Sequence, residues 1–353
     1  MKKLVFLFMV CVLVIGTLLG SCGEPEETTT ATTAPTTEPT TEPVETKVLR
    51  LSHPLPPFDR MVESTIQAAE EFNAIAGDEY KIEVFAGGVL GGMLEVFDMV
   101  QVGGLEMCDF APDYLSEKDL VFGAQGIPFA FKDAEAFTEF LGKIRAEIWN
   151  ERLEEKYNLK LLSLNLTFPH DGWCGTVPIE TLEDWTGKVV WVGGPAEAEA
   201  VTALGASPMT LDWGDGYPAI EKGIVDGGTY GLGAAWMLEW SACTYYTVAD
   251  FFVSSGGIVM NLDTFNDMPK DLQDSLVEIF KAHEDRMVQF FTYEAPQQAE
   301  ADLTAGGAEV YHVPADERAK WQEATKDVGE SYFSKLDPEI ATLIKSIMDE
   351  VNQ

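Results

Sequence analysis

The stretch TGKVVWVGG, residues 186–194, decides how the central part of this chain folds. Three valines and a tryptophan form a short apolar run that two glycines end, a pattern typical of a buried strand entering a tight turn. Trp191 therefore stands where a strand gives way to a loop. In α/β sheets small molecules bind beyond such strand ends, so the direction of this indole bears on function.

Strands and helices alternate on both sides of this stretch. Strands are predicted in VLRLSHPLPP from Val48 and in YKIEVFAGGVLGG from Tyr80, and after each one apolar residues recur at the spacing of one helix face. This order favours an α/β fold in which a sheet with parallel pairs carries helices on its faces. Another helix is predicted from Pro269 to about Leu303, which is long enough at 1.5 Å per residue to bridge two lobes.

The N-terminus has the pattern of an export signal. Two lysines precede an uncharged apolar run, and LGSC at residues 19–22 matches the site where bacterial signal peptidases cut before a lipid-modified cysteine. We therefore expect residues 1–21 to be removed and Cys22 to anchor the protein at the outer face of the cell membrane, in the periplasm of a Gram-negative cell. An uncleaved membrane anchor is the alternative. Residues 22–46, rich in Thr, Glu and Pro, are predicted to form an extended tether.

Charge and cysteine count exclude several classes of function. The chain has 59 acidic and 23 basic residues and a net charge of −36, so nucleic acid, whose phosphates require clustered Lys and Arg, is not an expected partner. Only Cys108, Cys174 and Cys243 lie in the folded region, and an odd number at wide spacing indicates small buried side chains rather than a disulfide framework. The four histidines lack zinc-site spacing, so neither a metal nor another cofactor is predicted.

Motifs of catalysis are equally scarce. The chain has no Gly-x-Ser-x-Gly elbow and no phosphate loop, and GLGAAW at residues 231–236 lacks the third glycine of a dinucleotide-binding loop. So many acids do not exclude a carboxylate pair of the glycosidase type, and a surface lipoprotein enzyme is an alternative on that ground. We expect no catalytic residue.

Aromatic residues gather in one block of the sequence. Six of the eight tryptophans lie between residues 173 and 240, together with Tyr217 and Tyr230. Rings at this density more often form core than pocket, because their burial drives folding. Several of them nevertheless stand beside glycines at predicted strand ends, where ligands bind.

The folded region resembles the substrate-binding subunits of TRAP transporters, the tripartite ATP-independent secondary transporters that use a soluble receptor. The resemblance rests on the first two strand segments, on EVFDMVQVGGLEMCDF at 95–110 and on GIPFAF at 126–131. Most specific are PIETLEDWTGKVVWVGG at 178–194 and LGASPMTLDWGDGYPAIEKGIVDGG at 204–228. These pieces occur in the family's order and spacing from Val48 to the C-terminal helices.

The resemblance implies a periplasmic-binding-protein-like fold with mixed sheets, in which two α/β lobes joined by hinge strands and a long helix close on one small molecule. We expect the first lobe to comprise residues 47–168 and 257–296 and the second residues 169–256 and 297–330, with C-terminal helices at 331–353. The resemblance also implies a non-catalytic receptor that passes its solute to the small and large membrane subunits of a permease.

One position departs from the family's pattern. Members that bind organic acids place an arginine in the strand after Gly-Leu-Lys, and here that position is Trp191. An indole does not neutralise a carboxylate, and a buried anion without a partner costs several kcal/mol. We therefore expect an amine, a quaternary ammonium or an aromatic compound, since a cation over a ring gains about 0.5 to 2 kcal/mol. The predicted ligand contacts are Trp191, Trp213, Tyr230, Tyr217, Trp173, Asp171, Asp212, His53 and Trp236.

Two other interpretations stay open. An organic acid is still a suitable ligand if Arg50, Arg60, backbone amides or a metal such as calcium supply the missing charge. A passive structural lipoprotein is a further alternative, and it predicts no ligand in a cleft.

Overall fold

A single mixed sheet connects the two halves of the folded chain. The computed structural model describes residues 45–353, apart from the side chains of residues 166–171. Its nine-stranded sheet has the order β2-β1-β3-β8-β4-β7-β5-β6, and β9 pairs with β8. The strands are β1 (Lys47–Ser52), β2 (Tyr80–Phe85), β3 (Met107–Phe110), β4 (Leu159–Gly175), β5 (Val189–Val192), β6 (Ser207–Thr210), β7 (Gly227–Gly228), β8 (Tyr245–Asn261) and β9 (Glu309–His312).

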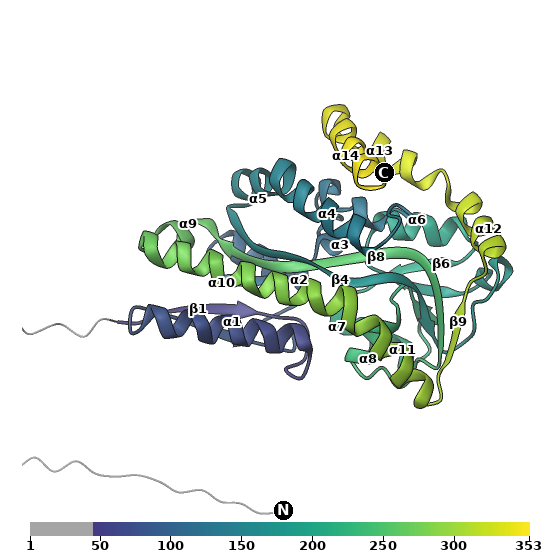
Figure 1. Cartoon of the computed structure of the whole chain (residues 1–353), viewed down its shortest axis with the longest axis horizontal. Coiled ribbons are helices and arrows are strands. Elements are labelled where there is room, and N and C mark those ends of the chain that lie inside the picture. The colour runs from purple at the N-terminus through teal and green to yellow at the C-terminus, as the bar shows by residue number, and fades with distance from the viewer. Residues whose placement is uncertain (1–44) are drawn as a thin grey trace, which may run out of the picture. The chain divides into compact units, whose positions relative to one another are not determined.

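Two long strands form the connection between the halves (Figure 1). At one end of the sheet β1 pairs in parallel with β2 and β3, and we call this end the β1 half. At the other end β5 pairs in parallel with β6 and β7, and we call it the β5 half. Between them β4 and β8, each 17 residues long, pair antiparallel. The expected two-lobed α/β fold with mixed pairing and connecting strands is therefore confirmed.

Helices cover both halves of the sheet. Asp59, for example, fixes the start of α1, because its side chain accepts a hydrogen bond from the Met61 N–H in the first turn. The helices are α1 (Arg60–Ala76), α2 (Met93–Gln101), α3 (Pro112–Leu115), α4 (Ala134–Ile144), α5 (Asn150–Tyr157), α6 (Pro195–Ala203), α7 (Trp213–Glu221), α8 (Leu232–Met237), α9 (Leu262–Asn266), α10 (Lys270–Gln289), α11 (Ala295–Ala305), α12 (Ala315–Thr325), α13 (Val328–Ser334) and α14 (Pro338–Val351).

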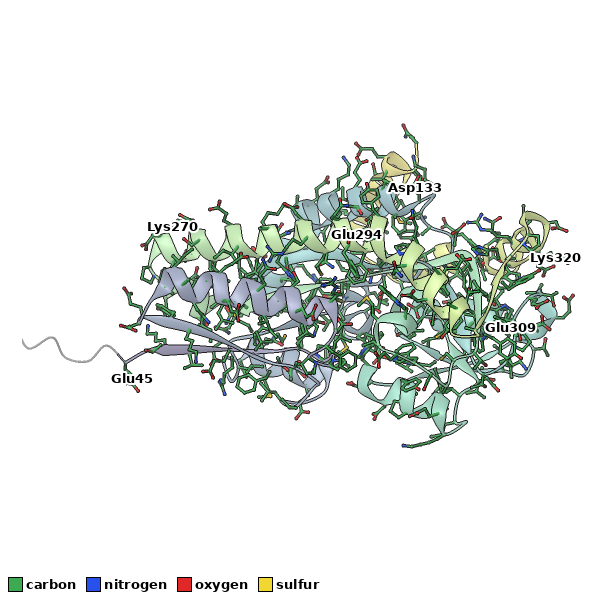
Figure 2. The ribbon with its side chains drawn as sticks, turned by 60° about the horizontal axis from the view of Figure 1, so that its bottom comes forward. Glu45, Asp133, Lys270, Glu294, Glu309 and Lys320 are labelled. Atoms are coloured by element: carbon green, nitrogen blue, oxygen red, sulfur yellow. The ribbon has the colours of Figure 1, made fainter. Side chains whose placement is uncertain are left out.

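One helical run crosses from the β1 half to the β5 half, as expected. Helix α10 continues through a π-helical turn, Phe290–Glu294, into α11, so that helical backbone extends from Lys270 to Ala305 (Figure 2). Its buried stripe packs α10 against α1 and β4 at one end, and α11 packs against α8 at the other. The apolar spacing seen in the sequence thus corresponds to the face that contacts both halves.

The expected cysteine environment is confirmed in the described residues. Cys108, Cys174 and Cys243 are all buried among apolar side chains. The predicted signal segment, the lipid site Cys22 and the tether up to residue 44 lie outside the described residues. Among residues 45–353 no helix is long and apolar enough to cross a membrane.

Candidate functional site

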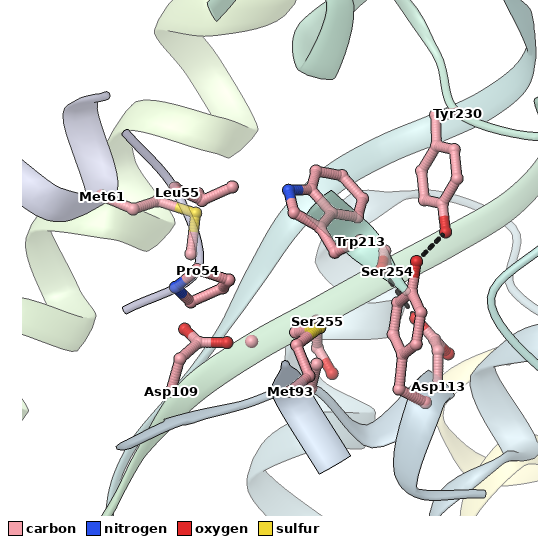
Figure 3. Close-up of a pocket in the computed structure, with 13 residues that line it drawn as sticks. Pro54, Leu55, Met61, Met93, Asp109, Asp113, Trp213, Tyr230, Ser254 and Ser255 are labelled. Carbon is pink, nitrogen blue, oxygen red and sulfur yellow. Dashed lines mark hydrogen bonds between the residues drawn. The ribbon is translucent and has the colours of Figure 1, made fainter. Parts of the chain in front are cut away.

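A small pocket lies between the two halves, beside the middle of β8 (Figure 3). Its cavity volume is about 50 Å³, which is space for only a few water molecules. The β1 half contributes residues that follow β1 and β3, and the β5 half contributes residues that follow β6 and β7, so the pocket lies beyond the carboxyl ends of parallel strands. The lining residues are Pro54, Leu55, Met61, Met93, Asp109, Ala111, Asp113, Tyr114, Trp213, Tyr230, Ser254, Ser255 and Gly256.

Aromatic rings form the pocket wall on the β5 half. Trp213, the first residue of α7, and Tyr230, which follows β7, line the cavity, and their rings meet edge to face at 5.0 Å between centroids. Tyr114 of α3 meets Tyr230 from the other half, with 2.8 Å between the two hydroxyl oxygens. We call Trp213 and Tyr230 the aromatic wall. Both Trp213 and Tyr230 were predicted from the sequence as ligand contacts.

Trp191 lies behind this wall and not on the pocket. Its side chain is fully buried, with ring centroids 4.3 Å from Tyr230 and 5.4 Å from Trp213. Its indole fills the space beside Gly216, where an added Cβ would lie 2.2 Å from the ring. In this structure the ring packs into the core beside the glycine of α7 and does not line the cavity, and a cleft-facing Trp191 stays a prediction.

Carboxyl groups form the opposite side of the pocket. Asp109 belongs to β3, and Asp113 belongs to the short helix α3 that follows this strand. Both carboxyl groups are buried and line the cavity. We call Asp109 and Asp113, together with the buried His53 and Asp59 behind Asp109, the acidic wall.

Asp113 is held by hydrogen bonds to its two oxygens. Gln125 Nε2 donates to Oδ1 at 2.5 Å and Ser254 Oγ of β8 donates to Oδ2 at 2.7 Å. Burial raises the pKa of Asp113 to about 6, and both hydrogen bonds act in the opposite direction because they favour the carboxylate. On the β5 half the pKa of Glu197 is raised to about 8, first by burial and then by the charge of Asp113. Because hydrogen bonds hold both of its oxygens, Asp113 is a hydrogen-bond acceptor in a fixed position.

Asp109 has a different environment. In the described residues no hydrogen bond reaches its carboxyl group, and its nearest polar partner is His53 Nε2, 3.7 Å from Oδ2. Burial raises the pKa of Asp109 to about 7, and the charge of Asp59 acts in the same direction. Burial also lowers the pKa of His53 to about 3, so the imidazole stays neutral. His53, a predicted ligand contact, thus lies behind Asp109 rather than on the cavity.

No lysine or arginine lines the pocket among the described residues. The two arginines considered as alternative acid-binding groups have other partners. Arg50 forms a bidentate pair with Glu106, with both N···O distances at 2.8 Å. Arg60 lies over the ring of Phe290 and contacts Glu63 on an exposed groove outside the pocket. The cavity wall therefore carries acidic groups without cationic ones.

The remaining predicted contacts lie elsewhere. Tyr217 stacks on Trp240 behind the aromatic wall, with centroids 5.6 Å apart. Trp173 is fully buried in a separate core cluster, where its Nε1 donates to Val177 O. Trp236 lies on the exposed groove and donates to Asp302. In this structure none of these three rings lines the cavity, because each packs against protein away from it, and their roles as ligand contacts stay predictions.

Two predicted acids have particular positions. Asp212 caps α7 through the Gly214 N–H and also accepts from the Met93 N–H at the start of α2, at 3.1 Å. It therefore joins the two halves at the pocket margin without lining the cavity. The backbone of Asp171 pairs with Phe252 in β4 and β8, and its side chain lies outside the described part of the structure.

Asp109 and Asp113 are the site residues that sequence reasoning missed. Asp109 stands in the apolar strand MCDF, where a buried carboxyl group is unusual, and this was the available signal. The chain has 59 acidic residues, so one acid within a short apolar run is easily overlooked in the sequence. Among the described residues no cluster of three or more His, Cys, Asp or Glu side chains is placed to hold a metal ion.

The fold and the pocket are typical of two-lobed binding proteins, whose ligand sites lie between the lobes. The family model described as bacterial extracellular solute-binding protein, family 7, matches residues 51–336. The chain belongs to this family and is a substrate-binding subunit of the TRAP type.

Three known proteins illustrate the relationship. The C4-dicarboxylate-binding periplasmic protein of Rhodobacter capsulatus is 22% identical over 316 residues, covering 87% of this chain and 92% of that protein. The 2,3-diketo-L-gulonate-binding periplasmic protein of Escherichia coli is 24% identical over 296 residues, covering 80% and 87%. A TRAP periplasmic solute-binding protein from Roseobacter denitrificans, solved with bound β-D-glucuronate, has a TM-score of 0.78 at 21% identity, covering 86% of this chain and 99% of that one.

Proposed function

We propose that this protein is an extracytoplasmic receptor that captures a small hydroxylated organic acid between its halves and delivers it to the two membrane subunits of a TRAP permease. The observation that carries the proposal is the pocket between Trp213 and Asp109, which combines a flat ring with several hydrogen-bonding groups. Membership of a family of solute-binding receptors supports capture rather than catalysis.

The ligand class follows from the relatives and departs from the expectation based on Trp191. The two curated relatives are named for acids, and the structural neighbour holds glucuronate. An amine or a simple aromatic compound has no support in these comparisons. Trp191, the residue that suggested such a ligand, is buried behind the pocket in this structure and does not line the cavity.

The side chains of the pocket suit a hydroxylated molecule. Carboxyl and serine oxygens accept hydrogen bonds from hydroxyl groups, and Asp109, Asp113, Ser254 and Ser255 supply them. The ring of Trp213 offers an apolar surface against which the C–H face of a sugar-like ligand packs. Sugar acids such as uronates carry both the hydroxyl groups and the carboxylate, so we propose them as the first candidates.

Capture requires the halves to separate. A cavity of about 50 Å³ is smaller than the 300–1,000 Å³ that small-molecule sites usually occupy, by roughly a factor of six or more. The halves are in close contact here, since an added Cβ at Gly194 would lie 2.7 Å from Asp113 O. We propose that β4 and β8 act as hinge strands, as in hinge closure around ligands generally.

Several finer expectations become part of this proposal. The lobe boundaries near residues 168 and 256 and the lipid anchor at Cys22 stay predictions that neither the described residues nor the comparisons test. Membership of the family supports a membrane permease as the partner. These expectations are compatible with a receptor whose ligand site lies in residues 54–256.

A ligand panel tests the proposal. The purified protein is heated with uronates, C4-dicarboxylates, neutral sugars and quaternary amines, because a ligand that binds only the folded state raises Tm as its concentration exceeds Kd. We expect a hydroxylated acid to give the largest rise and to be recovered unchanged. Stabilisation by amines alone would refute the ligand class, and chemical conversion of the ligand would identify an enzyme instead.

A further inference from the structure

One carboxyl group of the pocket, that of Asp109, has no hydrogen-bond partner among the described residues. Asp109 points into the cavity from β3, its carboxyl group is more than nine-tenths buried, and no described residue hydrogen-bonds to it (Figure 3). The carboxyl group lines the cavity and is not fully enclosed, so water in the cavity reaches it. A ligand that hydrogen-bonds Asp109 takes the place of this water.

Several ionisable groups around Asp109 determine the electrostatic environment of its carboxyl group. From the loop after β1 His53 approaches to 3.7 Å, and Asp59 at the start of α1 acts on Asp109 by charge repulsion. His283 of α10 acts on His53, and Arg286 acts on His283. Helix α2 presents Met93, β8 presents two serines, and α3 presents the carboxylate Asp113 to the same cavity.

An anionic ligand therefore meets acidic groups and a neutral imidazole. We infer, on the basis of the proposed function, that a neutral Asp109 donates its O–H to the ligand's carboxylate, so that capture of the acid takes up a proton in each molecule whose Asp109 is ionised before binding. The proton comes from solvent: the ionised Asp109 carboxylate accepts it, and the new O–H donates to a ligand carboxylate oxygen while the ligand keeps its charge. Asp113 does not serve this role, because both of its oxygens already accept hydrogen bonds.

This arrangement explains how an acid binds without arginine. A neutral carboxyl group offers one donor and one remaining acceptor, so it can contact the carboxylate and a hydroxyl group of the same ligand. Burial holds the pKa of Asp109 at about 7, so near neutral pH the group gains or loses its proton at little cost. Ligand affinity then depends on pH around neutrality.

The first test measures the proton directly in the wild-type protein. Calorimetric titration with glucuronate at pH 7.5, in buffers of different ionisation enthalpy, should show net proton uptake. The dissociation constant should rise about tenfold from pH 6 to pH 8, since a site with a pKa near 7 loses most of its neutral form over that interval. Binding without proton uptake and with a constant affinity would overturn the inference but leave the proposed function intact.

The second test uses Asp109→Asn, whose amide donates a hydrogen bond at every pH. This variant should bind glucuronate at pH 8 at least as tightly as the wild type, and its affinity should not change with pH. The matched control Asp271→Asn, an exposed acid in the first turn of α10, should keep the wild-type pH dependence. Loss of binding at both pH values in an Asp109→Asn protein that keeps the wild-type Tm would show that a neutral donor at this position does not hold the ligand, and would overturn the inference.

Failure of the proposed function gives a different result. If no organic acid binds the wild-type protein at any pH, the ligand class is wrong and the inference falls with it. If acids bind with wild-type affinity to Asp109→Asn and without proton uptake to the wild type, only the inference falls.

Discussion

The two walls of the pocket differ in how their residues are stabilised. In the aromatic wall Trp213 and Tyr230 rest on a continuous packed layer that includes Trp191 and Trp240. In the acidic wall Asp109, Asp59 and Asp113 are buried groups whose pKa values are all raised by desolvation. The first wall adds to the stability of the fold, and the second reduces it at neutral pH.

This difference indicates where specificity resides. Packed rings supply a rigid surface of fixed shape, which many ligands share. Buried carboxyl groups that lack partners store unfavourable energy which a matching ligand relieves, and such groups are concentrated at functional sites. We therefore expect variants of the aromatic wall mainly to lower stability or affinity in general, and variants of the acidic wall to change the pH dependence and the choice of ligand.

Trp191→Ala should have the largest effect. The side chain is fully buried against three other rings, so its removal should lower the free energy of unfolding by about 3–5 kcal/mol. Urea denaturation measures this loss, and Trp191→Phe, which keeps most of the ring, should lose much less. Unchanged stability together with lost binding would return Trp191 to the pocket and contradict its place in the core.

Asp59→Asn should stabilise the protein. One carboxyl oxygen accepts from the Met61 N–H, and the other has no partner in the described residues. Burial raises the pKa of Asp59 to about 7, so the folded state holds a proton that the unfolded state loses near pH 4. Wild-type stability therefore falls as pH rises from about 4 to about 7, by up to about 4 kcal/mol from this group.

The amide that Asp59→Asn introduces does not ionise, and its oxygen can still cap the helix. The variant should match the wild type near pH 4 and exceed it by about 1–4 kcal/mol above pH 7. Thermal unfolding across this pH range measures the difference. An equal effect at both ends of the range would show that Asp59 does not carry a raised pKa.

Trp213→Ala should separate binding from folding. The ring is only partly buried and lines the cavity, so its loss should weaken binding of the hydroxylated acid about 10- to 100-fold, or about 1.4–2.7 kcal/mol. Titration calorimetry measures the affinity. Trp236→Ala on the exposed groove is the matched control and should bind normally. A greater loss in the control would move the ligand site to that groove.

Asp212→Ala should have the smallest effect. Asp212 caps α7 and accepts from Met93 N across the two halves, but it is exposed to solvent. We expect a loss of about 1 kcal/mol in stability from the cap and a weakening of binding of about two- to fivefold. Asp215→Ala removes an acid from the same turn of α7 without touching Met93. If both variants bind equally, the contact between the halves does not favour the closed form.

The architecture could be predicted because apolar residues recur at regular spacing along each long helix and strand. The spacing of apolar residues after Pro269 located α10 and α11, and the short run at Val189–Val192 located β5. The family's motifs supplied the connection between the halves, which depends on pairings between β4 and β8 that no local pattern encodes.

The site was only partly predictable. Trp213 and Tyr230 were found because rings are rare enough for a dense block to be visible. The direction of Trp191 depends on Gly216, 25 positions later in the chain, and on the space that this glycine leaves. Asp109 was missed because its one local signal, an acid within the apolar strand MCDF, is hard to recognise in a chain with 59 acidic residues until the fold buries it.

A crystal structure with glucuronate bound would show which residues hold the ligand. We expect the sugar acid between Trp213 and Asp109, with a carboxylate oxygen within hydrogen-bond distance of the Asp109 carboxyl group and no arginine in contact with it. A ligand bound against Arg60 on the exposed groove, or one that turns Trp191 out of the core to meet it, would show that this pocket is not the binding site described above.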